Sequence, residues 1–109
     1  MPVNIHSVGE VLTVYLEGEI DHHAAKGMRE EIDAAVEFNM PSLLILDFDR
    51  VTFMDSSGIG LVMGRYKLMK DISGKVFIQN APAAIKKVMR MAGIEKLLFK
   101  ESRKEFAVK

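Results

Sequence analysis

The sequence predicts an α/β sandwich, in which a mixed β-sheet starts with an antiparallel hairpin and continues with parallel strands joined by crossover helices. Three observations predict this fold class. A segment rich in β-branched and aromatic residues comes early, after a short segment that can pair with it. Stretches with helical spacing of apolar residues then alternate with short apolar runs, and cap or turn residues separate them. Strands that alternate with helices in this way form a parallel sheet.

The length and composition indicate one folded domain that spans residues 1–109. Against a prior of about 150 residues per domain, this length leaves no room for a second core. The hydrophobic share is 49%, and 15 Lys and Arg balance 15 Asp and Glu, so the formal net charge is zero. The chain therefore carries no basic field that would attract nucleic acid or an anionic membrane, and neither is an expected partner.

The chain contains no cysteine, which excludes disulfides and thiolate metal sites and is typical of the reducing cytosol. Its first residues lack a basic segment followed by a long apolar run, and no apolar stretch approaches the roughly 18 residues that span a bilayer. His22 and His23 are adjacent and point in different directions on a helix, so they form no two-histidine metal face. We therefore expect a cytoplasmic protein without a metal or a cofactor.

The first half of the chain is predicted to form the hairpin, a helix and a central strand. Residues 11–16 are rich in β-branched and aromatic side chains after a Gly-Glu turn, and residues 3–6 are expected to pair with them as an edge strand. Asp21 offers a carboxylate cap for a helix that runs to about Phe38. The apolar and small residues of this helix recur at helical spacing: Ala25, Met28, Ile32, Ala35 and Val36. Residues 43–46 form a continuous apolar run, which is typical of a strand buried on both faces.

A second helix is predicted over residues 57–70, after three residues with capping side chains. Asp55, Ser56 and Ser57 supply a carboxylate and two hydroxyls directly before apolar residues at three- and four-residue steps. A Ser-Gly turn then leads to residues 76–78, another short apolar strand.

The last part of the chain is predicted to form a third helix, a strand and a short terminal helix. Pro82 fits the first turn of the third helix, and Gly93 is placed as its terminator. Its buried face is expected to contain Ile85, Val88, Met89 and Ala92. Residues 97–99 read as a last strand, and Ser102 with Glu105 forms a capping box for the terminal helix.

The segment 51–67, VTFMDSSGIGLVMGRYK, places a carboxylate, two hydroxyls and several glycines at a strand-to-helix junction. The glycines are spaced GxGxxxG, which differs from the GxGxxG of dinucleotide-binding folds, and no Lys followed by Ser or Thr completes a P-loop. A serine hydrolase elbow requires GxSxG, but Met54 and Asp55 stand two residues before the serines. A small serine hydrolase would need a histidine base supplied through a tertiary contact.

Two further interpretations of the serines stand beside the hydrolase. Ser56 or Ser57 at a helix amino terminus can accept a phosphate, because backbone N–H groups and the helix dipole favour the new dianion. Alternatively, the Asp-Ser-Ser segment only caps the helix, which is an ordinary role for these residue types. Residue types alone favour the capping role.

A helical wheel predicts two apolar faces on the second helix. The face expected in the core carries Ile59, Val62, Met63, Tyr66 and Met69. The opposite face combines small residues with leucines: Ser57, Gly60, Leu61, Gly64 and Leu68. Packing under a loop would explain this second face, but small residues beside leucines also permit the close approach of a partner backbone.

Four segments of the chain resemble the STAS domain family and, within it, the anti-sigma factor antagonists of the sporulation branch. They are GEIDHHAA from Gly18, VTFMDSSGIG from Val51, GRYK from Gly64 and APAAIKKVMRMAGIEKL from Ala81, and they occur in family order over nearly the whole chain. The resemblance implies a STAS-type sandwich and a protein-binding phosphoswitch that is not an enzyme.

The resemblance also implies partners and residue roles. Ser56 is the expected phosphoacceptor of a partner anti-sigma factor, which is itself an ATP-dependent serine kinase, and a PP2C-type phosphatase is expected to reverse the reaction. The unphosphorylated form is expected to bind the anti-sigma factor and so release the sigma factor. Glu19, Asp21, Gly60 and Arg65 match family contact positions.

The second face of the wheel and the resemblance together predict one partner-binding surface beside Ser56. Its residues are Glu19, Asp21, Asp55, Ser57, Gly60, Leu61, Gly64, Arg65 and Leu68. One alternative is an antagonist in a general-stress sigma system, and another, from a different class, is a small serine hydrolase. Asp-His-His at positions 21–23 favours the sporulation branch by resemblance only.

Overall fold

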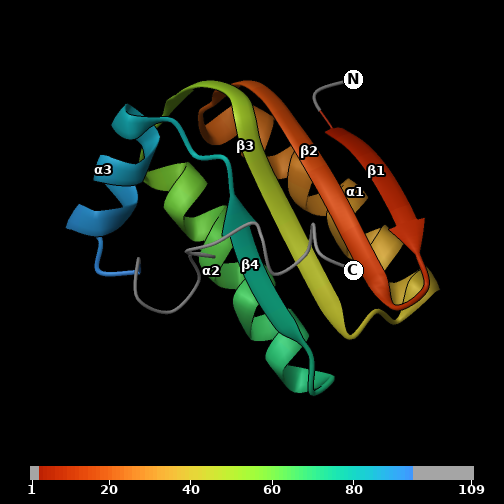
Figure 1. Cartoon of the computed structure of the whole chain (residues 1–109). Coiled ribbons are helices and arrows are strands. Elements are labelled where there is room, and N and C mark those ends of the chain that lie inside the picture. The colour runs from red at the N-terminus through yellow and green to blue at the C-terminus, as the bar shows by residue number, and fades with distance from the viewer. Residues whose placement is uncertain (1–2, 95–109) are drawn as a thin grey trace.

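Within the residues that the structure describes, the protein forms a four-stranded mixed sheet with two helices packed on one face and a third helix that contacts the third strand (Figure 1). This computed structural model describes residues 3–94. Strand β1 (Val3–Val8) pairs antiparallel with β2 (Val11–Ile20), and β3 (Leu43–Met54) and β4 (Lys75–Gln79) continue the sheet in parallel. The predicted class, hairpin and parallel strands are confirmed.

Three helices connect and follow these strands. They are α1 (His22–Asn39), α2 (Ser56–Asp71) and α3 (Ala83–Met91). Pro82 is the residue before α3, one position earlier than predicted, and Gly93 follows the helix end with a φ of +78°, which confirms it as the terminator. The predicted strand at 97–99 and the terminal helix with Ser102 and Glu105 lie outside the described residues.

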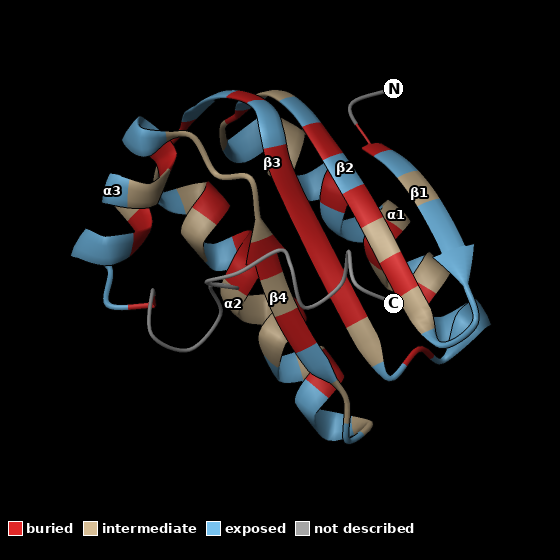
Figure 2. Ribbon diagram, in the orientation of Figure 1, coloured by how far each residue is buried: buried red, intermediate tan, exposed pale blue. Residues whose placement is uncertain are grey.

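The core lies between the sheet and helices α1 and α2 (Figure 2). The sheet contributes alternate residues of its strands: Leu12, Val14, Leu16, Leu44, Leu46, Phe48, Val76 and Ile78. The two helices contribute Met28, Ile32, Val36, Val62 and Met69. Each of these side chains is at most 3% exposed, so each stabilises the fold by about 1.5–3 kcal/mol relative to exposure.

Strands β2 and β3 are longer than the sequence predicted. The predictions ended at residues 16 and 46, where the continuous apolar pattern ends, but the strands continue to Ile20 and Met54. Register shifts interrupt the pairing between Tyr15 and Glu17 and between Gly18 and Glu19, so these extensions lack the regular alternation that a strand prediction depends on.

Asp47 is a charged residue within the buried part of strand β3, and its hydrogen bonds explain how it is accommodated there. It is 4% exposed, and its carboxylate accepts hydrogen bonds from Gln79 Nε2 (2.9 Å), Asn80 Nδ2 (2.8 Å) and the backbone N–H of Asp49 (2.9 Å). A buried carboxylate that accepts several hydrogen bonds offsets part of its desolvation penalty. These bonds also fix the chain where β4 ends and the turn toward α3 begins.

Candidate functional site

The carboxyl ends of β2 and β3 bring the two predicted caps to one edge of the sheet. Ile20 lies opposite Met54 in the parallel register, and the Asp55 N–H donates a hydrogen bond of 3.3 Å to the Ile20 carbonyl. Asp21 and Asp55 are the next residues along these neighbouring strands. The Asp21 loop and the serine loop therefore share one edge of the sheet.

Both aspartates cap helices, as predicted. Asp21 Oδ1 accepts a hydrogen bond of 2.9 Å from the N–H of Ala24, and Asp55 Oδ1 accepts one of 2.8 Å from the N–H of Ser57. Each bond satisfies one of the amide groups that a helix leaves unpaired in its first turn. Asp55 thus caps α2, the role that the residue types favoured for the Asp-Ser-Ser segment. The hydroxyls of Ser56 and Ser57 are not needed as the cap.

Ser56 is the first residue of α2 and is exposed to solvent, whereas Ser57 is half-buried. A hydroxyl at this position lies beside the positive end of the helix dipole, which favours a negatively charged substituent. Within residues 3–94, the structure has no hydrogen bond between a histidine and Ser56 or Ser57.

Three glycines of α2 face different surroundings. A Cβ at Gly58 would collide with Cγ and Sδ of Met54 and would touch Ile20 at 3.4 Å. A Cβ at Gly60 or Gly64 would meet no atom within 4 Å. Gly58 is thus required for packing against the sheet, whereas Gly60 and Gly64 border open space.

A groove of about 530 Å³ runs between α1 and α2. Helix α2 lines it with five of the residues that the sequence singled out: Ser57, Gly60, Leu61, Gly64 and Arg65. Helix α1 contributes four residues that the site prediction missed: His22, Ala25, Lys26 and Arg29. Their spacing of i, i+3, i+4 and i+7 puts them on one side of a helix, and this pattern was the available signal.

The helical wheel was wrong to place Leu61 on the face opposite the core. Leu61 is 4% exposed, because α2 packs against the sheet on one side and against α1 on the adjoining side. On the face expected in the core, Val62 and Met69 are buried as predicted, but Ile59, Met63 and Tyr66 are only half-buried. The packing direction of α2 is therefore rotated toward α1 relative to the wheel.

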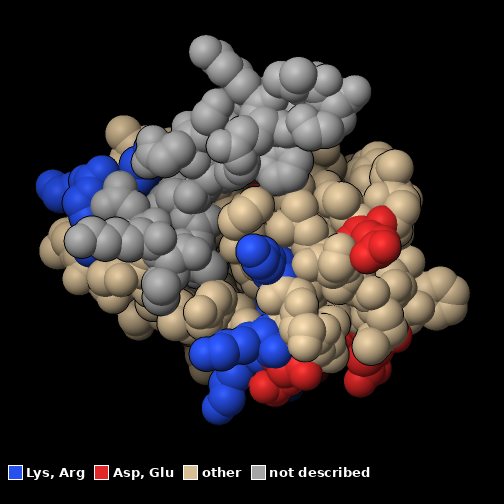
Figure 3. Space-filling view, turned by 60° about the horizontal axis from the view of Figure 1, so that its bottom comes forward, with Lys and Arg blue, Asp and Glu red and all other residues tan. Residues whose placement is uncertain are grey.

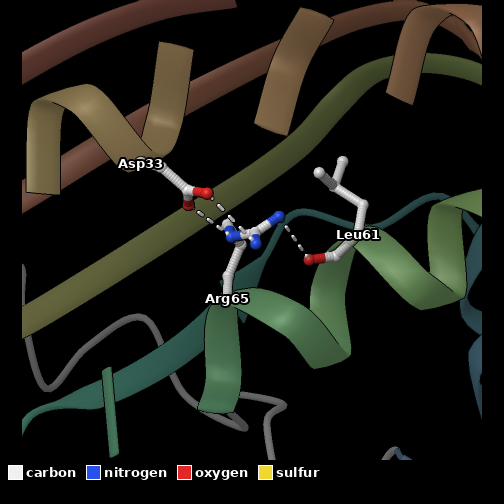
Figure 4. A network of polar contacts seen from close by, with 3 residues as sticks. All are labelled: Asp33, Leu61 and Arg65. Carbon is white, nitrogen blue, oxygen red and sulfur yellow. Dashed lines mark hydrogen bonds and ion pairs between the residues drawn. The ribbon is translucent and has the colours of Figure 1, made fainter. Parts of the chain in front are cut away.

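Arg65 lies in the contact between the two helices rather than on an open surface (Figure 4). Its Nε lies 2.9 Å from Asp33 Oδ1, its Nη2 donates to Asp33 Oδ2 at 3.4 Å, and its Nη1 donates to the Leu61 carbonyl at 3.4 Å. Burial lowers the pKa of Arg65, the charge of Asp33 opposes this shift, and the positive charge of Arg29 adds to it. The ion pair joins α1 to α2, and its Arg65 also lines the groove.

The remaining predicted residues lie around the groove or beyond it. Glu19 is exposed near the end of β2, and Asp21 directly precedes α1. Leu68 is half-buried and packs against the core, and it is not among the residues that line the groove. The structure therefore brings most of the predicted surface together but separates Leu68 from it.

The surface carries charges of both signs, as expected from equal numbers of basic and acidic residues. At the end of the molecule where the parallel strands begin, basic and acidic side chains are interspersed, and a basic and an acidic cluster lie side by side at the lower edge of the view (Figure 3). Across residues 3–94, no helix is long and apolar enough to cross a membrane. The same residues contain no group of three His, Cys, Asp or Glu side chains that could hold a metal ion.

Known proteins are similar to this chain in sequence and in fold. A family model of the STAS domain matches residues 2–106. The anti-sigma F factor antagonist of Paenibacillus polymyxa is 33% identical over 88 residues, which cover 81% of this chain and 75% of that protein. The anti-sigma factor antagonist SpoIIAA in its unphosphorylated form superposes with a TM-score of 0.83 and 30% identity, over 97% of this chain and 92% of that one. The Bacillus SpoIIAA in its phosphorylated form has a TM-score of 0.75 and 31% identity, over 97% and 96%. This chain belongs to the STAS domain family.

Proposed function

We propose that this chain is an anti-sigma factor antagonist, whose unphosphorylated form binds an anti-sigma factor and thereby releases a sigma factor. The observation that carries the proposal is the exposed Ser56 at the head of α2, in a chain that is 33% identical to a protein named anti-sigma F factor antagonist. The solved structures of SpoIIAA in unphosphorylated and phosphorylated forms support a switch based on phosphate.

The proposed switch is the phosphorylation of Ser56 by the anti-sigma factor, acting as a serine kinase with ATP. The Ser56 Oγ forms a bond to the γ-phosphorus of ATP, the bond from that phosphorus to the bridging oxygen of ADP breaks, and the hydroxyl proton passes to a base of the kinase. A PP2C-type phosphatase would return the serine by hydrolysis. In this proposal the chain is a substrate and a binding partner, not an enzyme.

The partner-binding surface is proposed to surround Ser56. It comprises Glu19, Asp21, Asp55, Ser57, Gly60, Leu61, Gly64 and Arg65, whereas Leu68, which packs against the core outside the groove, is not included. The shared edge of the two capped loops and the open space at Gly60 and Gly64 support this assignment.

Phosphorylation is proposed to act locally. The phosphate adds about 1.5 to 2 negative charges where the N–H groups of α2 can hold them, so the domain has no reason to refold. A partner surface shaped for a neutral hydroxyl would have to bury an unmatched dianion, which is strongly unfavourable. Ser56→Asp should therefore weaken binding, while Ser56→Ala should bind and resist the kinase.

The test is incubation of the chain with ATP and the anti-sigma F factor of Paenibacillus polymyxa, followed by mass spectrometry. We expect one added phosphate on a peptide that contains Ser56, and none in the Ser56→Ala variant. Phosphate on Ser57, or undiminished phosphate in Ser56→Ala, would refute the assignment. Tighter binding to an anti-sigma-B factor would favour the general-stress alternative. Ester hydrolysis that Ser56→Ala abolishes would favour the hydrolase.

A further inference from the structure

The groove between α1 and α2 has a cationic wall and a wall of small and aliphatic residues. Helix α1 provides His22, Lys26 and Arg29, and α2 provides Gly60 and Gly64. Among residues 3–94, no Asp or Glu lines the groove, although α1 carries Asp33 and three glutamates elsewhere along its length. The acidic residues of α1 are thus segregated from the groove.

The positive charge of this wall is not neutralised within the described chain. Asp33 is engaged by Arg65, with 2.9 Å between the paired atoms, and Arg29 lies close enough to Arg65 to lower its pKa. The guanidinium of Arg29 therefore lies near this ion pair without taking part in it. Within residues 3–94, Lys26 and Arg29 form no ion pair, and both side chains are exposed.

The shape of the groove favours a polypeptide segment over an isolated side chain. The open space at Gly60 and Gly64 allows a backbone to approach α2 closely, and the half-buried Ser57 lies at the same wall. Charged groups at such an interface select partners of opposite sign and accelerate their encounter. A segment that carries a carboxylate can place this charge beside the cations of α1 while its backbone lies against the glycines of α2.

We propose that this groove binds an acidic segment of the anti-sigma factor, with an Asp or Glu carboxylate beside Lys26 and Arg29 and the segment backbone over Gly60 and Gly64. This inference rests on the proposed function and names the chemistry of the partner surface.

The same arrangement gives a reason why phosphate at Ser56 opposes binding. Ser57 lines the groove and Ser56 is its neighbour at the head of α2, so a dianion on Ser56 lies at one end of the groove. It would repel the acidic segment and attract the cations that hold it. The charge of the groove would thus couple recognition of the partner to the phosphorylation state.

The experiment compares charge reversals inside and outside the groove in the full chain. Lys26→Glu and Arg29→Glu are each measured by surface plasmon resonance against the anti-sigma F factor of Paenibacillus polymyxa with bound nucleotide. Lys75→Glu is the matched control, because it changes the same charge at an exposed position where β4 begins, at the opposite edge of the sheet. Circular dichroism and the melting temperature verify that every variant folds.

We expect each groove variant to bind about five- to tenfold more weakly, mainly through a slower association rate that depends less on salt. The Lys75→Glu control should stay within about twofold of the unmodified chain. A set of single Asp or Glu to Lys substitutions in the anti-sigma factor should then include one that restores binding of Arg29→Glu.

Each other outcome contradicts a different part of the argument. If the unmodified chain does not bind the anti-sigma factor, the proposed function fails and this inference fails with it. If it binds and the groove variants match the Lys75→Glu control, the function stands and the groove is not the docking site. If the groove variants bind weakly but no substitution in the partner restores binding, the groove holds a phosphate or another free anion instead of a carboxylate of the partner.

Discussion

The two sides of helix α2 contain glycine for different physical reasons. On the sheet side, Gly58 is buried, and any side chain there would collide with Met54. On the groove side, Gly60 and Gly64 contact nothing that a Cβ would disturb. Glycine lowers helix stability by about 1 kcal/mol relative to alanine. No contact within residues 3–94 requires glycine at positions 60 and 64, so the fold of these residues does not explain the two groove-side glycines. Gly58 is thus required for folding, whereas the reason for Gly60 and Gly64 lies outside the fold. This difference supports a partner surface at the groove.

The largest effect that tests this comparison is expected from Gly60→Leu. A leucine would occupy the open space where the anti-sigma factor is proposed to lie, so the dissociation constant should rise about a hundredfold, or about 2.7 kcal/mol. The free energy of unfolding should stay equal or increase, because leucine favours the helix. Isothermal titration calorimetry and urea denaturation measure the two quantities.

Gly27→Leu is the matched control for this variant. Gly27 is an exposed glycine in α1, a Cβ there meets no atom within 4 Å, and it does not line the groove. It should therefore retain the affinity of the unmodified chain. An unchanged dissociation constant for Gly60→Leu would show that the partner binds elsewhere.

Gly58→Ala tests the other half of the comparison. Its Cβ would force Met54 to move within the core, so the free energy of unfolding should fall by about 1–3 kcal/mol, as for other overpacked cores. Gly60→Ala should instead raise it by about 0.5–1 kcal/mol through helix propensity. Urea denaturation of both variants at one temperature gives the two signs, and equal signs would remove the distinction between the two sides.

Arg65→Met should have a smaller effect, and it decides between two roles for this residue. The family resemblance implies a partner contact, but the side chain is 7% exposed and pairs with Asp33, which is 38% exposed. Because solvent screens Asp33, we expect the free energy of unfolding of Arg65→Met to fall by about 1–2 kcal/mol, a value between those of surface and buried ion pairs.

The readout that separates the roles is a double-mutant cycle with Asp33→Asn, measured for both unfolding and partner binding. A coupling energy in unfolding alone identifies a structural link between α1 and α2. A larger loss of partner affinity in Arg65→Met than in Asp33→Asn would instead identify Arg65 as a residue that contacts the anti-sigma factor.

The elements with regular patterns could be predicted from the sequence. The helical spacing from Met28 to Val36 and the caps at Asp21 and Asp55 located α1 and α2 within a residue or two. The run at 43–46 located only the start of β3, because its continuation contains Asp47, whose burial depends on hydrogen bonds from residues 32 and 33 positions away. No local pattern encodes partners at such a distance.

The site was predicted in part for a related reason. A helical wheel gives the angle between residues but not the direction from which neighbours pack, so it could not place Leu61 against α1. It also treated α2 alone, whereas the cations of the groove come from α1. Lys26 and Arg29 become part of a site only when Arg65 and Asp33 bring the two helices together.

The smallest expected effect concerns Asp21, which lies at the edge shared by both helix starts. Asparagine caps a helix about as well as aspartate, so Asp21→Asn should change the free energy of unfolding by no more than about 0.5 kcal/mol while it removes one negative charge. If Asp21 contacts a cation of the anti-sigma factor, the affinity should fall about three- to fivefold, with a weaker salt dependence. Asp21→Ala is the comparison variant, because it also removes the hydrogen bond that Ala24 donates and should lower stability by about 1 kcal/mol. Calorimetric binding and melting curves of the two variants separate the effects: equal affinity for Asp21→Asn and the unmodified chain would restrict Asp21 to capping and confine the partner surface to the groove side of α2.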